Sequence, residues 1–131
     1  MKRSGILNRE LAHLVACMGH TDLLVVCDAG FPVPVDVRCV DLALTTNQPR
    51  LLDVLEAINQ ELVVEKLMVE KETTQYSPEL RRAILGLYEG IPSEEIAHLD
   101  LKALCMRARA VVRTGECTPY ANVVLVGGVP Y

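Results

Sequence analysis

Short, unbroken apolar runs that alternate with segments of helical periodicity constrain the fold of this chain more than any other feature. Residues 23–27 are Leu-Leu-Val-Val-Cys, and similar runs occupy residues 110–112 and 122–126. Apolar runs of this length, bounded by turn residues, are typical of strands that are buried on both faces. Such strands occur where helices cover both sides of a mostly parallel sheet, so the sequence predicts an α/β fold.

The remaining pattern locates the other elements. Apolar residues at helical spacing, with Asn8 as an N-cap and Pro49 and Pro78 in first turns, predict four helices. We predict helices at residues 8–18, 49–60, 77–89 and 100–109, and strands at residues 23–27, 37–42, 64–70, 95–98, 110–112 and 122–126. The short connection between the last two strands predicts that they are antiparallel neighbours. We therefore expect a three-layer α/β sandwich with a mixed, mostly parallel sheet of about six strands.

The composition favours a single domain that associates with copies of itself. The 131 residues contain no repeat or flexible linker, so we expect one domain over residues 1–131. Half of the residues are hydrophobic although only 4% are aromatic, which makes the apolar content largely aliphatic. A chain of this length buries only about two-thirds of the surface that it exposes when unfolded. We therefore expect a homo-oligomer, although a β-rich aliphatic core alone would also account for the composition.

Charge and hydropathy exclude several classes of partner. Asp and Glu total 17 against 13 Lys and Arg, so the formal net charge of -4 makes the protein a poor partner for nucleic acid or anionic lipid. No apolar run approaches the ~18 residues that a membrane span requires. We therefore expect a cytoplasmic protein without a nucleic-acid or membrane partner.

The sequence gives little support for a metal or cofactor. The five cysteines are odd in number and form no Cys-x-x-Cys pair, which argues against a disulfide framework and a zinc ribbon. His13 and Cys17 lie one helical turn apart and His20 follows, so a metal-dependent hydrolase is one hypothesis. However, Cys17 borders the apolar helix face, where a free cysteine usually packs as a small hydrophobe. Because a glycine-rich phosphate loop and a serine nucleophile elbow are also missing, we expect no metal and no cofactor.

Polar residues at the ends of predicted strands are the first candidates for a binding or catalytic site. Asp28 follows the first strand, and His98 lies at a strand-to-helix junction, where ligands of open α/β sheets collect. Either residue can instead be a plain turn or helix-start residue. His20 follows a helix C-terminus, whose dipole favours imidazolium, so it is either a titrating catalytic group or a surface cap. For Asp22 we favour the role of a cap in the same turn.

A second group of candidates lies between the last two predicted strands. Tyr120 and Asn122 carry a phenol and an amide, which both donate and accept hydrogen bonds and suit sugar hydroxyls. Both residue types are also common in turns. Residues 113–116, Arg-Thr-Gly-Glu, either bind an anion or stabilise a turn by pairing charges, and we favour the turn.

Four short blocks occur in a fixed order along the chain. They are Met-Gly-His-Thr-Asp at 18–22, Asp-Ala-Gly-Phe-Pro at 28–32, Arg-Thr-Gly-Glu at 113–116 and Tyr-Ala-Asn at 120–122. Together they resemble the D-ribose pyranase and L-fucose mutarotase family, and the resemblance extends over essentially the whole chain. Thr-Pro-Tyr-Ala-Asn at 118–122 is closer to the ribose branch. Residues 97–102, Ala-His-Leu-Asp-Leu-Lys, keep the His and Lys of the ribose-branch pattern Ser-His-Glu-Glu-Phe-Lys but not the residues between them.

The resemblance implies an RbsD-like enzyme that interconverts the β-pyranose and β-furanose forms of free D-ribose for ribose utilisation, without a cofactor. It also implies a homo-oligomer, a decamer of stacked pentameric rings, with sites near subunit boundaries. By the same resemblance His20 is the catalytic acid, and the residues that bind the sugar are Asp28, His98, Tyr120, Ala121 and Asn122.

The chemistry of ring interconversion agrees with these residue types. Opening a pyranose requires a proton on the ring oxygen and removal of the proton from the anomeric hydroxyl, which suits a histidine near neutral pH. Two alternatives stay open. One is a mutarotase of another sugar such as L-fucose, and the other is a non-catalytic sugar-binding accessory protein of ribose transport.

Overall fold

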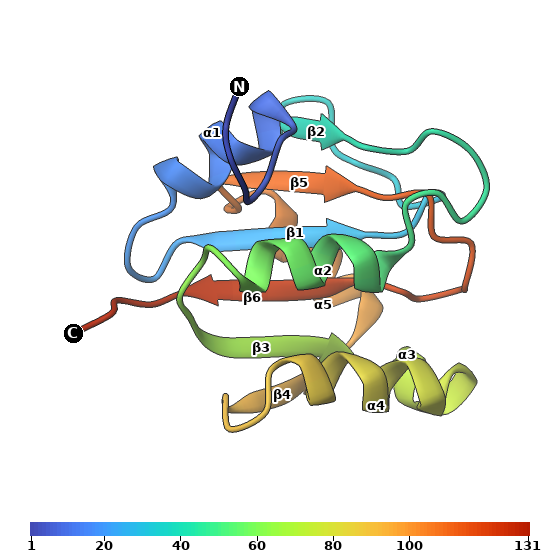
Figure 1. Ribbon diagram of the computed structural model, residues 1–131. Coiled ribbons are helices and arrows are strands. Elements are labelled where there is room, and N and C mark those ends of the chain that lie inside the picture. Colours follow the sequence, from blue (N-terminus) through green and yellow to red (C-terminus); the bar gives the residue numbers. More distant parts are fainter.

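The computed structural model describes residues 1–131 as a six-stranded sheet with helices on both faces (Figure 1). In chain order the elements are α1 (Arg9–Cys17), β1 (Leu23–Cys27), β2 (Cys39–Asp41), α2 (Leu51–Asn59), β3 (Val64–Glu70), α3 (Lys71–Tyr76), α4 (Pro78–Leu87), β4 (Ser93–Ile96), α5 (His98–Cys105), β5 (Ala110–Arg113) and β6 (Val123–Gly127). Helices α1, α2 and α4 pack on one face of the sheet and α5 packs on the other. The predicted three-layer α/β sandwich is therefore confirmed.

The strand order is β2-β5-β1-β6-β3-β4. Five strands run in one direction and β6 runs against both of its neighbours, which confirms a mixed, mostly parallel sheet. The prediction that the last two strands are neighbours is wrong, because β1 lies between β5 and β6. The nine residues that connect them cross the end of β1. They need to span only two strand spacings of about 4.8 Å each, which nine residues do easily.

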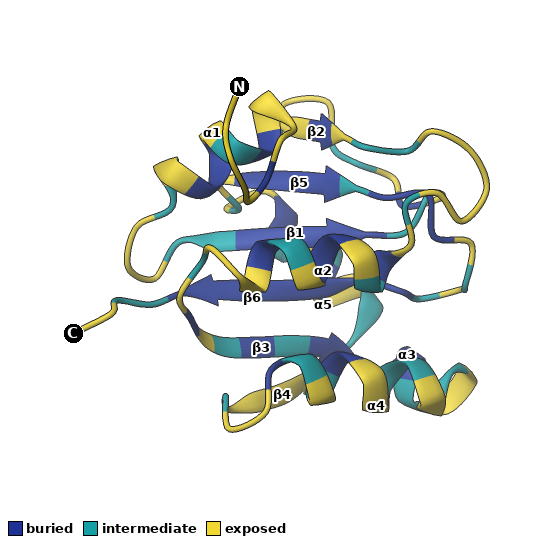
Figure 2. Cartoon of the chain, in the orientation of Figure 1, coloured by how far each residue is buried: buried dark blue, intermediate teal, exposed yellow.

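The central strand β1 explains why its sequence is an unbroken apolar run. Leu24 and Val26 belong to the core beneath α1, α2 and α4, whereas Val25 and Cys27 belong to the core beneath α5. All four side chains have no exposed surface, as the dark blue strand in Figure 2 shows. A strand covered on both faces has no position at which a polar side chain can reach water.

Some element boundaries agree with the predictions. β1 and β3 have the predicted bounds. α1 is held at the predicted start because Asn8 Oδ1 accepts a hydrogen bond from the Leu11 N–H at 2.9 Å. β2 covers only part of the predicted strand at 37–42, because it is an edge strand that pairs with β5 through three residues.

Other boundaries differ from the predictions. β4 is Ser93–Ile96 and α5 is His98–Cys105, so the strand predicted at 95–98 and the helix predicted at 100–109 both lie too late in the chain. α2 begins after Arg50, so Pro49 precedes the helix. Helix α3 was not predicted, because Lys-Glu-Thr-Thr-Gln-Tyr has no apolar stripe.

Several large apolar side chains lie exposed on the surface of the single chain. They include Val35, Leu44, Leu99 and Met106. None of the helices has both the length and the apolar character needed to cross a membrane.

Candidate functional site

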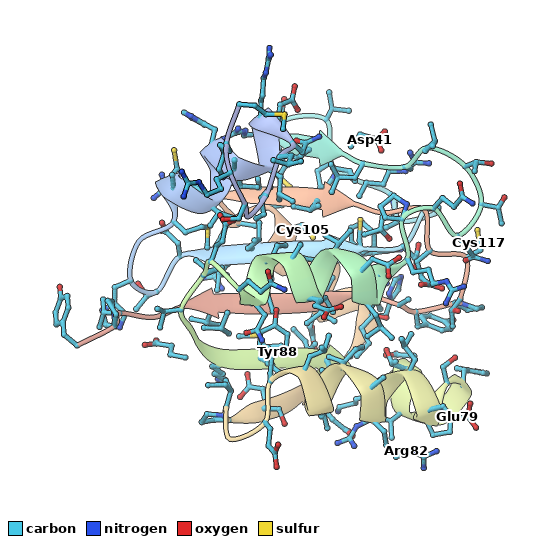
Figure 3. All side chains as sticks on the ribbon, viewed as in Figure 1. Asp41, Glu79, Arg82, Tyr88, Cys105 and Cys117 are labelled. Atoms are coloured by element: carbon cyan, nitrogen blue, oxygen red, sulfur yellow. The ribbon has the colours of Figure 1, made fainter.

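One edge of the sheet collects most of the predicted site residues. Five strands end at this edge and the antiparallel β6 begins there (Figure 1), and Cys117 on the β5–β6 connection marks it in Figure 3. Asp28 follows β1, Glu70 ends β3, His98 follows β4, and Asn122 precedes β6. This is the edge at which ligands bind in open α/β sheets.

A chain of buried hydrogen bonds connects these side chains. Asn122 Oδ1 accepts a hydrogen bond from the Asp28 N–H at 2.9 Å, and Asn122 Nδ2 donates to Glu70 Oε1 at 3.3 Å. Glu70 Oε1 also lies 2.7 Å from His98 Nδ1. Both Asn122 and Glu70 are buried. The network therefore fixes Asp28 and His98 relative to each other, although they come from distant parts of the chain.

Aromatic rings surround the imidazole of His98. The Phe31 and Tyr120 rings meet it edge-on, with centroid distances of 6.2 and 5.3 Å, and Tyr76 of α3 stacks on Tyr120 at 5.4 Å. The chain has one Phe and four Tyr, so most of its aromatic side chains are concentrated here. Stacked and edge-on rings give apolar walls to a site whose centre is polar.

Asp28 is half-buried beside the segment that precedes β6. Burial raises the pKa of Asp28, and hydrogen bonds from the Gly30 N–H, the Asn122 side chain and the Ala121 main chain act in the opposite direction. Tyr120 has a positive φ of 57°, and its carbonyl accepts a hydrogen bond from the Thr73 hydroxyl of α3. Asp28 also lines an open hollow of about 310 Å³ beside residues 116–119.

His20 lies at the opposite edge of the sheet. Its Nε2 is 2.9 Å from Glu65 Oε2 near the start of β3, and both side chains are largely exposed. Asp22 accepts a hydrogen bond from the Gly19 N–H at 2.8 Å and pairs with Arg109 at 2.7 Å, and these contacts lower the pKa of Asp22. Asp22 therefore caps the turn that carries His20, as the sequence favoured.

The length of β3 separates the two histidines. His20 contacts Glu65 near the beginning of β3, and His98 contacts Glu70 at its end. Five residues of a β-strand span about 17 Å, which is several times the width of a sugar ring. One chain therefore brings Asp28, His98, Tyr120, Ala121 and Asn122 together but does not bring His20 to them.

Arg113 has a structural role, and the pair of His13 and Cys17 lies apart from the site. Arg113 pairs with Asp41 at 3.0 Å and donates a hydrogen bond to the Ala29 carbonyl, so it holds the loops after three strands. His13 Nε2 lies 3.4 Å from Cys17 Sγ. No group of three or more His, Cys, Asp or Glu side chains is arranged to hold a metal ion.

Sequence reasoning missed two carboxylates of the site. Glu70 is a buried acid at the carboxyl end of β3, and Glu72 on α3 accepts a hydrogen bond from the His98 N–H at 3.2 Å. A signal for Glu70 was present, because the predicted strand at 64–70 ends in a charged residue at the ligand-binding edge. No sequence pattern pointed to Glu72.

The fold and the site define an α/β protein that places acid–base and hydrogen-bonding groups where such sheets bind small molecules. The chain belongs to the RbsD / FucU transport protein family, whose model matches residues 1–130. This confirms the family predicted from the sequence.

Individual relatives match over their full length. A protein named D-ribose pyranase from Chloroflexus aggregans is 49% identical over 131 residues, and the match covers 100% of both chains. The structure of Bacillus subtilis RbsD complexed with D-ribose has a TM-score of 0.95 and 40% identity, covering 100% of each chain. A fucose mutarotase from Streptococcus pneumoniae in complex with L-fucose has a TM-score of 0.83 at 20% identity, covering 95% of each chain. The last likeness shows a shared fold.

Proposed function

We propose that this chain is a D-ribose pyranase, which interconverts the β-pyranose and β-furanose forms of free D-ribose by acid–base ring opening and reclosure. The observation that carries the proposal is the match, over the whole of both chains, to the Bacillus subtilis RbsD structure complexed with D-ribose. The name of the Chloroflexus aggregans relative supports the same function at 49% identity.

The proposed roles follow from the chemistry of each group. His20 is the acid that protonates the ring oxygen, because its imidazole is exposed and histidine is the side chain that most often serves as a general acid. The Asp28 carboxylate and the His98 ring bind sugar hydroxyls. Tyr120 binds the sugar through the face of its ring and its phenol. Ala121 and Asn122 bind it through main-chain hydrogen-bonding groups.

A complete site takes His20 from a second copy of the chain. His20 and His98 are separated by the length of β3, about 17 Å, so one sugar cannot touch both within a single chain. In a ring of subunits, the His20 edge of one copy can face the His98 edge of the next. The exposed Leu99, next to His98, suits such a contact because it is 75% exposed on the single chain. We therefore propose a homo-oligomer, a decamer of stacked pentameric rings.

The reaction needs no cofactor, because ring opening breaks one carbon–oxygen bond, reclosure forms another, and otherwise only protons move. We propose that the protein acts in the cytoplasm on free D-ribose, the form in which the sugar enters ribose utilisation. The mildly acidic chain, with a formal net charge of -4, suits a neutral substrate better than an anionic one.

Saturation-transfer NMR on D-ribose tests this function directly. We expect the protein to accelerate exchange between the β-pyranose and β-furanose signals, and His20→Ala to lower the acceleration by about 10²–10⁴-fold. His13→Ala is the matched control, because His13 is also an exposed histidine and lies on α1 away from the site. Parallel measurements on L-fucose decide between sugars. Ribose binding without faster exchange would instead favour a non-catalytic accessory protein.

A further inference from the structure

We propose that Glu70 is a positioning residue for this ring interconversion. Its carboxylate holds His98 in the tautomer that is protonated on Nδ1, so that Nε2 is free to take the proton of the anomeric hydroxyl. The inference rests on the proposed function and adds a second proton-transfer group to His20.

The burial of Glu70 is the first observation. Glu70 has no exposed surface, although it is the last residue of β3, at the carboxyl ends of the parallel strands. Its Oε1 receives the hydrogen bonds from His98 and Asn122, whereas its Oε2 has no hydrogen-bond partner within the chain. A buried carboxylate that is only half satisfied is unfavourable for stability, so its presence at a ligand-binding edge points to a functional role.

The orientation of His98 is the second observation. Its Nδ1 points inward to Glu70 at 2.7 Å, and its side chain is 23% exposed. An ionised carboxylate only accepts hydrogen bonds, so Nδ1 carries the proton and Nε2 presents its lone pair. Glu70 thus resembles the third group of a catalytic triad, whose carboxylate orients the histidine that acts as the base.

Titratable groups from several elements surround His98 and Glu70. Glu72 on α3 accepts a hydrogen bond from the main-chain N–H of His98, Asp28 faces the ring from the loop after β1, and Cys105 faces Glu70 from α5. Burial raises the pKa of Glu70, and the hydrogen bonds from His98 and Asn122 partly oppose this. The carboxyl groups of Glu70 and Asp28 therefore both interact electrostatically with the His98 ring.

The proton movements balance over a complete cycle. The proton of the anomeric hydroxyl passes to His98 Nε2, the electron pair left on O1 forms the carbonyl, and the bond between C1 and the ring oxygen breaks. The ring oxygen takes its proton from the imidazolium of His20 in the second copy. On reclosure the 4-hydroxyl oxygen adds to C1 and gives its proton to His20, while the carbonyl oxygen recovers a proton from Nε2. Both histidines return to their starting states.

Glu70→Gln tests the inference by removing the charge while keeping the shape. We expect the maximal exchange rate on D-ribose to fall by about 10- to 100-fold with little change in KM, because the sugar contacts stay in place. The dependence of the rate on pH should also change, because the charge of the carboxylate bonded to His98 Nδ1 is removed. Glu70→Asp, which keeps the charge, should recover part of the rate. Glu95→Gln is the matched control, because Glu95 lies on the neighbouring β4 and contacts only Thr74 and Arg81.

A second measurement does not depend on the variant folding. The chain has three histidines, so two-dimensional ¹⁵N NMR of the histidine-labelled protein can assign the tautomer of each ring. We expect His98 to be protonated on Nδ1, and protonation on Nε2 alone at neutral pH would overturn the inference. An unchanged rate and pH profile in Glu70→Gln would also overturn it. Failure of the wild-type protein to accelerate exchange would instead reject the proposed function. The tautomer of His98 is measured without ribose, so the two failures can be told apart.

Discussion

Two inactive variants should restore each other's activity if every site combines residues from two copies of the chain. His20→Ala removes the proposed acid from an exposed position at one edge of the sheet. His98→Gln removes the imidazole at the other edge and keeps an amide that can donate to Glu70. Because β3 separates the two positions by about 17 Å, neither substitution disturbs the other position within one chain.

The magnitude follows from random assembly. In oligomers formed from equal amounts of the two variants, a site is intact when its His20 comes from one variant and its His98 from the other. Each condition is met in half of the cases, so about one quarter of the wild-type activity should return at equal amounts, and less at any unequal ratio. If both histidines of a site came from one chain, no mixed oligomer would contain an intact site.

Saturation-transfer NMR on D-ribose measures the recovery. The two variants are co-expressed with different tags, and oligomers carrying both tags are purified, so that mixed assemblies alone are assayed. The variants combined after separate assembly serve as the control and should remain inactive. Activity of the mixed oligomers no greater than that of the separate variants would refute the two-copy site.

Two further predictions concern the turns that hold the site. Asp22→Asn keeps the oxygen that accepts the Gly19 N–H but loses the charge pair with Arg109, so we expect unfolding by denaturant to show a loss of about 0.5 kcal/mol at pH 7. Because these two contacts lower the pKa of Asp22, its contribution is present above about pH 4 and is lost as the pH falls, so wild type and variant should become equally stable in acid. Thr114→Val should cost about 1–3 kcal/mol of unfolding free energy, because the buried Glu116 N–H loses the Thr114 hydroxyl that accepts its hydrogen bond. Thr114→Ser keeps that hydroxyl and should lose much less, and equal losses in the two variants would contradict this explanation.

The sequence determined those parts of the fold that depend on neighbours along the chain. The run at 23–27 and the alternation at 64–70 predicted β1 and β3 with their observed bounds, because burial on one or both faces leaves a periodic record. Asn8 marked the start of α1 for the same local reason, since an N-cap bonds to a residue three positions later. Helix α3 left no such record, because its polar residues form no apolar stripe.

The order of the strands was beyond local reasoning. The sequence suggested that the last two strands pair with each other, but β1 lies between them. β1, β5 and β6 are all buried apolar strands, so no local pattern shows which of the three lies between the other two.

Some residues of the site could be identified from the sequence, and others only from the tertiary structure. The sequence identified Asp28, His98 and the segment 120–122, because residues that follow strands of a parallel sheet meet at one edge. Only the tertiary structure placed Glu70 behind His98, and only it placed His20 at the far end of β3. Contacts between residues 28 positions apart or more depend on strand order and strand length, which no local pattern records. The sequence thus determined which residue types serve the chemistry, and the tertiary structure decided which of them can meet within one chain.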